Sequence, residues 1–230
     1  MRPFPTTRTT GAEKRQPMTR PWVVALCLFA CIHPSHIRAQ TADTYRQRAT
    51  ELSQAKSWDD AITNYGKALD LEPNDAVTHY NLALALKYKG DHREALKEFQ
   101  AAIHLRPKWA EAHYGLGATW YDLQNQSEAI NELHTAESLD PAHAATHRLL
   151  ARILSQQSNS HDAEHELKLA LQAKPSADIH LELGVVEGQL GKLTEAAAQF
   201  RQAIQLDSKL AAAHLMLGIA LRRQSDHKGA

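Results

Sequence analysis

A single residue pattern recurs from Tyr45 to the end of the chain, and it limits the possible folds more than any other feature of the sequence. Its clearest thread is an alanine that returns after 34 residues, or once after 33: Ala61, Ala95, Ala129, Ala163, Ala196 and Ala230. A large apolar residue follows four positions after each of the first five alanines, and a second alanine comes three positions later. This pattern predicts small, similar units that bury their apolar faces by stacking on one another.

One copy of the pattern, residues 76–107, carries the signals of two helices. Leu82 and Leu86 lie about one turn apart and predict a buried stripe on the first helix. Gly90 then supplies a helix stop, and Asp91 follows it as the expected N-cap of the second helix. A proline ends the second helix in four copies: Pro73, Pro107, Pro141 and Pro175. Each copy is therefore expected to be a helix–turn–helix unit.

Small residues recur beside a leucine in the first helix of each later copy. The pairs are Leu82-Ala83, Leu116-Gly117, Leu150-Ala151, Leu183-Gly184 and Leu217-Gly218. We expect these small residues to let two helices approach closely. The one missing residue falls between Pro175 and His180, in a linker, where its loss leaves both flanking helices intact.

These residues resemble the tetratricopeptide repeat, a 34-residue helix–turn–helix pattern with fixed Leu-Gly/Ala, Ala, Phe/Tyr, Ala and Pro positions. The resemblance covers residues 42–230 and implies an all-α fold, a right-handed α-solenoid of such units. The expected repeats are about 42–75, 76–109, 110–143, 144–176, 177–210 and a partial unit, 211–230. Ala230 falls where the second helix of that last unit would begin.

The resemblance also implies a binding surface, because the family's usual one is the concave groove lined by the first helices. Carried over position by position, the groove residues are Tyr80, Lys87, Tyr88, Tyr114, Tyr121, Asp122, Arg148 and Arg152, with Arg222 and Arg223 in the last unit. Aromatic faces and cations along one groove suit an extended peptide with carboxylates. The alternative is that these are ordinary solvated positions. The Lys/Asn set with which some family members clamp a C-terminal carboxylate is missing, since Asn81 stands alone.

Two groups of residues resemble metal chemistry, and for both we expect no metal and no cofactor. His161 to His165 spell H-x-x-E-H, a zinc protease signature, but the repeat register places them at the exposed start of a second helix, with no third ligand in view. One repeat position carries a ladder of histidines: His79, His113, His147, His180 and His214. Neighbouring rungs are too far apart to share a metal, so we expect these side chains to pack between units. No catalytic residues are predicted.

Residues 1–39 have the layout of an export signal, with a basic stretch followed by an eleven-residue apolar run that is too short to span a bilayer. Cleavage after Ala39 would make Gln40 the mature N-terminus, and Met18 is an alternative start. A second interpretation is a lipoprotein, because Leu28 to Cys31 resembles a lipobox with Cys31 as the acylated residue. The localisation is therefore predicted to be periplasmic or secreted, or anchored through Cys31.

The charge distribution limits the partners. Residues 1–39 hold six Lys or Arg and one acid, so the rest of the chain has 20 basic and 25 acidic residues, a net charge of about −5. This body does not suit nucleic acid, and it suits a membrane only if the chain is lipidated at Cys31. We expect an exported protein–protein interaction scaffold, not an enzyme, with assembly of an envelope or secretion complex as a narrower hypothesis. The alternative is the N-terminal targeting array of a larger enzyme whose catalytic domain lies beyond Ala230.

Overall fold

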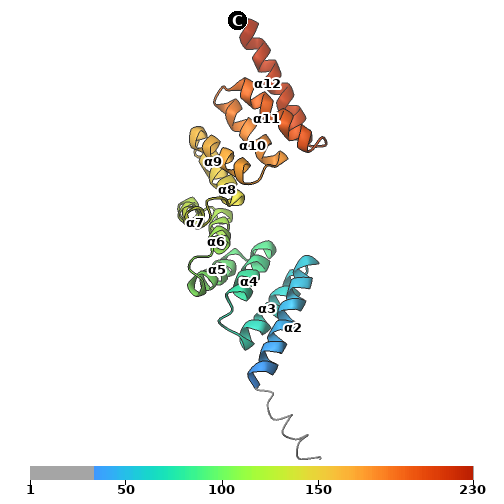
Figure 1. Ribbon diagram of the computed structural model, residues 1–230, viewed down its shortest axis with the longest axis vertical. Coiled ribbons are helices and arrows are strands. Elements are labelled where there is room, and N and C mark those ends of the chain that lie inside the picture. Colours follow the sequence, from blue (N-terminus) through green and yellow to red (C-terminus); the bar gives the residue numbers. More distant parts are fainter. Residues whose placement is uncertain (1–33, 230) are drawn as a thin grey trace, which may run out of the picture.

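The computed structural model describes residues 34–229, with side chains from 41 to 225. The first helices of the repeats are α2 (Pro34–Gln54), α4 (Ala76–Lys89), α6 (Ala110–Asp122), α8 (Ala144–Gln156), α10 (Ala177–Gln189) and α12 (Ala211–Gly229). The second helices are α3 (Trp58–Leu71), α5 (His92–Leu105), α7 (Gln126–Leu139), α9 (Ser160–Ala173) and α11 (Leu193–Leu206). The helices follow one another along one elongated array (Figure 1), which confirms the predicted all-α solenoid.

The helix boundaries follow from local backbone chemistry. Gly90 ends α4 with φ of 101°, a left-handed conformation that favours glycine, and its N–H donates to the carbonyls of Leu86 and Lys87. Asp75 caps the start of α4 by accepting from the Val77 N–H at 3.2 Å. Asp91 is the N-cap residue of α5, as predicted, but its side chain makes no capping hydrogen bond and pairs with Lys89.

The recurring alanines lie where two helices pack most closely. The alanines at this position are 0% exposed in all five complete repeats: Ala61, Ala95, Ala129, Ala163 and Ala196. The large apolar residue four positions later is also buried, and Phe99 is among the largest fully buried side chains. A Cβ placed on Gly115 would come within 2.4 Å of the Phe99 ring, so this glycine is required where α6 crosses α5. Among the described residues, the buried side chains form four hydrophobic clusters that follow one another along the array.

The first helices form the inner side of the array. Neighbouring first helices contact one another, as α2 does α4, α4 does α6, α6 does α8 and α10 does α12. Neighbouring second helices in the described part do not pack against each other to that extent. The array therefore curves toward its first helices, which leaves their free face as an inner surface.

The ladder histidines join the two helices of their own repeats. The Nδ1 atoms lie 2.6, 2.7 and 2.8 Å from a glutamate Oε2 on the second helix in the pairs His79/Glu98, His113/Glu132 and His147/Glu166. The Nε2 atoms of the same histidines lie 2.9 to 3.1 Å from the carbonyl of the proline six residues earlier. Because a carbonyl only accepts, Nε2 donates to it, which leaves Nδ1 facing the carboxylate of the second helix. These three histidines therefore connect the two helices of a repeat by hydrogen bonds, in addition to the predicted packing.

The two ends of the described array differ from the expected repeats. Helix α2 begins at Pro34, ahead of the predicted boundary at residue 42 and within the predicted signal segment. The rest of that segment, with Met18 and Cys31, lies outside the described residues. Helix α12 continues to Gly229 through the place where a turn was expected. No helix in residues 34–229 combines the length and apolar character needed to cross a membrane.

Candidate partner-binding groove

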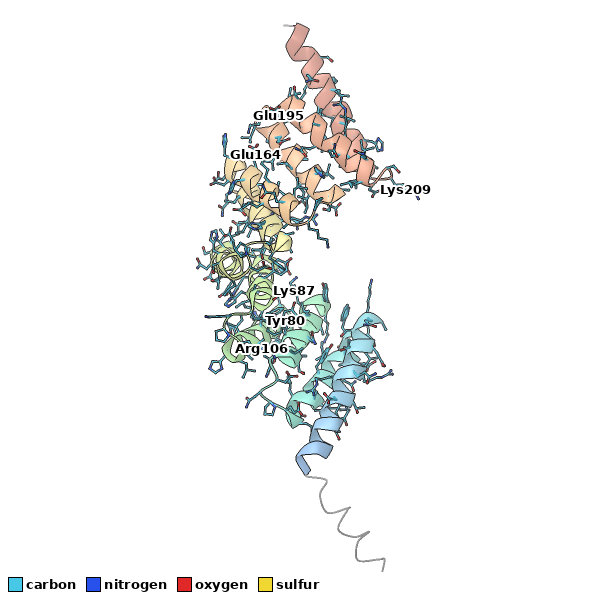
Figure 2. The ribbon with its side chains drawn as sticks, viewed as in Figure 1. Tyr80, Lys87, Arg106, Glu164, Glu195 and Lys209 are labelled. Carbon is cyan, nitrogen blue, oxygen red and sulfur yellow. The ribbon has the colours of Figure 1, made fainter. Side chains whose placement is uncertain are left out.

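Aromatic side chains gather on the inner face around α4 and α6. Their ring centroids are 5.3 Å apart in the stacked pair Tyr88/Trp58, 4.6 Å in Tyr80/Trp109 and 5.0 Å in Tyr114/His143. Tyr80 and Lys87 both lie on α4, near the middle of the array (Figure 2). Tyr88 is 66% exposed although it stacks on Trp58, so one face of its ring remains open to a partner.

Most of the predicted polar groove residues bind the neighbouring first helix. The contacts are Lys87 Nζ to Asp122 Oδ2 at 2.7 Å, Gln156 Nε2 to Tyr121 Oη at 2.7 Å, and Arg148 to both oxygens of Glu182 at 2.9 Å. The hydrogen bond to Glu182 raises the pKa of Arg148, which stays charged in any case. These contacts join α4 to α6, α6 to α8 and α8 to α10. The predicted groove residues are thus brought onto one face, but many of them hold the array together.

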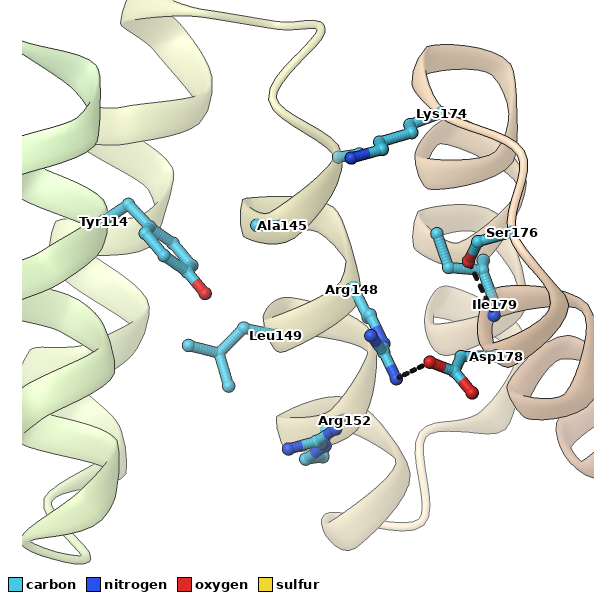
Figure 3. Close-up of a pocket in the computed structure, with 10 residues that line it drawn as sticks. Tyr114, Ala145, Arg148, Leu149, Arg152, Lys174, Ser176, Asp178 and Ile179 are labelled. Atoms are coloured by element: carbon cyan, nitrogen blue, oxygen red, sulfur yellow. Dashed lines mark hydrogen bonds and ion pairs between the residues drawn. The ribbon is translucent and has the colours of Figure 1, made fainter. Parts of the chain in front are cut away.

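Between α6, α8 and α10 the groove opens into a cavity of about 490 Å³ (Figure 3). Tyr114 points into it from α6, Leu149 from α8, and Lys174 and Arg152 lie on opposite sides of Arg148. Arg152 has a single 3.4 Å contact with Glu182 and a side chain that is 49% exposed. Lys174 is exposed and comes from the linker after α9. The cavity therefore presents an aromatic hydroxyl, an apolar floor and two cations with capacity to bind further.

The charges around the cavity act on Tyr114. Burial raises the pKa of its hydroxyl, and the nearby Tyr88 raises it further. Arg152 and Arg148 act in the opposite direction, so five of the predicted groove residues, with Asp122 among them, lie within electrostatic reach of one another. The Tyr114 hydroxyl stays protonated at neutral pH and can both donate and accept a hydrogen bond.

A second, smaller pocket of about 220 Å³ lies between α10, α11 and α12. Its lining is mainly apolar and includes Val185, Met216 and Ile219, with Arg223 among the lining residues. Leu215, on α12, is 62% exposed. The first helices therefore change along the array, from aromatic in α4 and α6, through cationic in α8, to aliphatic in α10 and α12.

The H-x-x-E-H sequence does not assemble a shared site. His161 and His165 are exposed on α9, while Glu164 is only 6% exposed and receives Lys168 and Lys192 at 2.6 Å each. Those two lysines lower the pKa of Glu164. The carboxylate thus ties α9 to the start of α11 and lies in a salt bridge that sequence reasoning did not anticipate.

Sequence reasoning also missed Lys174, Leu149 and the lining of the apolar pocket. Lys174 lies in a linker, where no repeat position indicates that its side chain reaches the groove. The aliphatic residues of the fifth and sixth repeats do occupy predicted groove positions. Leu181 and Leu215 share the repeat position of Tyr80 and Tyr114, and Val185 and Ile219 share that of Arg152.

Comparisons with known proteins agree with the repeat register. A family profile described as "TPR repeat" matches residues 50–90 and 186–225, and one described as "Tetratricopeptide repeat" matches residues 80–144. Together these matches cover more than half of the chain. The comparison with curated proteins gave no significant match.

Solved structures of similar fold share little sequence with the chain. PilF of Pseudomonas aeruginosa is 19% identical, with a TM-score of 0.73, over 83% of this chain and 87% of that protein. MamA from Desulfovibrio magneticus RS-1 is 22% identical, with a TM-score of 0.65, over 74% and 97%. YrrB, described as a TPR protein with an unusual peptide-binding site, is 21% identical, with a TM-score of 0.58, over 74% and 88%.

The profile matches, the helix pairs and the structural neighbours all lead to one assignment. TPR repeats form scaffolds for protein–protein interaction, and the architecture described here is of that kind. The chain belongs to the tetratricopeptide repeat family.

Proposed function

We propose that this array is an exported scaffold that binds an extended segment of a partner protein along its first helices. The observation that carries the proposal is the cavity between α6, α8 and α10, lined by Tyr114, Arg148, Arg152 and Lys174. A cavity on the inner face, with cations that retain exposed donors, suits a carboxylate-bearing peptide segment. The peptide-binding site named for YrrB lends support by analogy of fold alone.

The different sections of the groove indicate the order of side chains in such a segment. Tyr88 and Tyr114 offer aromatic surface at one end, and the pocket with Val185 and Met216 takes an aliphatic side chain at the other. An acidic residue between them would meet Lys174 and Arg152. A partner segment with this order runs from the second repeat, which holds Tyr88, to the sixth, which holds Met216.

The groove is tested with peptides selected from a random library on the full chain, whose affinities are then measured by calorimetry. Lys174→Ala/Arg152→Ala is the informative variant, because both side chains are exposed and contribute little to packing. Loss of a hot spot costs about 2 kcal/mol, so we expect binding to weaken by about 30-fold. Tyr114→Ala and Arg148→Ala would change packing as well as binding, because Tyr114 packs on the core and Arg148 binds Glu182.

The matched control is Lys97→Ala/Arg201→Ala, two exposed cations on the second helices α5 and α11. It removes the same charge from the opposite face, and we expect unchanged affinity. If the groove variant keeps full affinity and the control loses it, the partner binds the outer face and the proposal is wrong. Circular dichroism of both variants checks that the helices remain.

Export is the second part of the proposal, and it is supported by the residue layout from Met18 to Ala39. We expect N-terminal sequencing and intact mass of the protein from its native host to give a chain that begins at Gln40. A mass with an acylated Cys31 would favour the lipoprotein, and an uncleaved cytosolic product would contradict export. A role in assembly of an envelope or secretion complex rests on this export step.

A further inference from the structure

Glu137 breaks the repeat pattern at a position that is otherwise apolar. The residue directly after the second fixed alanine is Leu69, Ile103, Leu171 or Ile204 in the other complete repeats. Three of these four side chains pack against the hydrophobic core. In the third repeat the position holds a carboxylate whose side chain is 29% exposed. A charge at a core-facing position needs a partner, and the nearest polar groups identify one.

Glu137 faces a histidine of the ladder and its glutamate. Its Oε1 lies 3.8 Å from His147 Nδ1, which is itself 2.8 Å from Glu166 Oε2. One ligand atom of each of the three residues lies within 4.8 Å of the other two. The residues come from three successive helices, α7, α8 and α9. His134 Nδ1, one turn earlier on α7, lies 3.0 Å from the other oxygen of Glu137.

The orientation of His147 leaves one ring nitrogen facing two carboxylates. The side chain is 2% exposed, and its Nε2 donates to the Pro141 carbonyl at 2.9 Å, which fixes the ring and leaves Nδ1 directed at the two carboxylates. Ligand atoms about 2.0–2.1 Å from a tetrahedral metal are about 3.3 Å apart. The observed 2.8 and 3.8 Å separations lie on either side of that value, so shifts of about half an ångström would equalise them.

Charge distinguishes this rung from the other histidine–glutamate rungs. In the rungs of His79 and His113 a single carboxylate faces the imidazole. At His147 two carboxylates, those of Glu137 and Glu166, face the same ring nitrogen. A divalent cation bound to a neutral imidazole and two carboxylates gives a neutral group.

We propose that Glu137, His147 and Glu166 bind a first-row divalent cation, for which Zn²⁺ is the natural probe, and that His134 positions Glu137. The H-x-x-E-H sequence takes no part in this site. The three ligands join the second helix of the third repeat to both helices of the fourth. Of the consecutive described helices, α7 and α8 pack against each other least extensively, so a cation here would fasten the weakest junction of the array.

The test uses the full chain without an affinity tag, stripped with EDTA and titrated with Zn²⁺ by calorimetry. We expect one equivalent to bind, with a rise in Tm, and Co²⁺ to give the visible absorption of a tetrahedral site. Glu137→Leu installs the residue that the first and fourth repeats carry, so it should fold and lose the bound equivalent. Glu166→Gln should weaken binding by more than about 100-fold, since even outer-shell changes cost about 10–100-fold.

The matched control is Glu132→Gln, which makes the same change in the His113 rung. Glutamine is tolerated there, because Gln199 fills that position opposite His180 in the fifth repeat. The control should keep the full equivalent, and His134→Ala should weaken binding by about 10-fold. The proposal is overturned if the wild-type chain binds no more Zn²⁺ than Glu137→Leu, or if Glu132→Gln loses the cation as fully as Glu166→Gln.

Discussion

Replacing Glu187 by leucine should make the array more stable at neutral pH. Glu187 lies on α10 with 2% of its surface exposed, and its Oε2 has no hydrogen-bond partner among the described residues. The same repeat position holds Leu86 and Leu154 in the second and fourth repeats. The Glu187→Leu change therefore removes a buried, incompletely bonded carboxylate and restores a side chain that the architecture already accommodates.

The magnitude follows from what the carboxylate loses on burial. An unsatisfied buried polar group costs about 1–3 kcal/mol, and replacing buried charges by well-packed apolar residues stabilises proteins by about 1–4 kcal/mol. We expect a gain of about 1–3 kcal/mol at pH 7. In an array of this size each kcal/mol corresponds to a rise in Tm of about 2–4 °C.

The pH dependence of the gain identifies its cause. Burial raises the pKa of Glu187 above its ordinary 4.5, and the charge of Glu164 adds to that, while Lys168 and Lys192 act in the opposite direction. The folded state therefore takes up a proton at a pH where the unfolded chain is still ionised. The loss of stability caused by the ionised Glu187 is complete above the folded-state pKa. It decreases as the pH falls through that pKa toward 4.5. The advantage of the leucine variant should shrink over the same range.

Urea unfolding of both proteins, followed by circular dichroism from pH 8 down to about pH 4, measures this advantage. Leu154→Glu, which places a carboxylate at the same position one repeat earlier, is the reverse control and should lower stability by a comparable amount. A Glu187→Leu variant that is no more stable than wild type at pH 7 would refute the reasoning. So would a gain that is independent of pH, because ionisation would then not be its source.

The remaining predictions concern single contacts in the array. Gly115→Ala should destabilise by about 1–3 kcal/mol, because its Cβ would lie 2.4 Å from the Phe99 ring, whereas Gly218→Ala, with nothing within 4 Å, should stabilise α12 by up to about 1 kcal/mol in thermal melts. A double-mutant cycle of Arg148→Ala and Glu182→Ala should give a coupling of about 1 kcal/mol or less that weakens in high salt, since Arg148 is 34% exposed.

The fold was predictable because its determinants repeat. The alanine thread from Ala61 to Ala196 fixes where two helices touch, and each copy supports the reading of the others. Asp91 takes the predicted N-cap position of α5, but its carboxylate pairs with Lys89 and makes no capping hydrogen bond. The extension of α12 to Gly229 also differs from the pattern, since Ser158, the equivalent of Ser225 two repeats earlier, lies in a turn after α8 with φ of 62°.

The sequence predicted which face of the array forms the groove, but it did not predict which groove side chains are already paired within the protein. Lys87 and Arg148 were expected to meet a partner, yet their carboxylates, Asp122 and Glu182, come from the next repeat. Those contacts depend on the angle between neighbouring first helices, which composition and spacing do not specify. Lys174 was missed because the conformation of its linker decides where its side chain goes.

Two glutamates show why departures from the repeat are informative only when their surroundings are known. Glu137 and Glu187 each replace an apolar residue of the pattern, and in the sequence the two changes are equivalent. In the structure Glu137 meets His147 and a second carboxylate, while one oxygen of Glu187 meets no polar group in the described residues. The same change to leucine is therefore expected to remove a cation site at 137 and to relieve a buried charge at 187. The two changes to leucine have opposite consequences, a lost binding site and a gain in stability, because folding supplies different partners to each carboxylate.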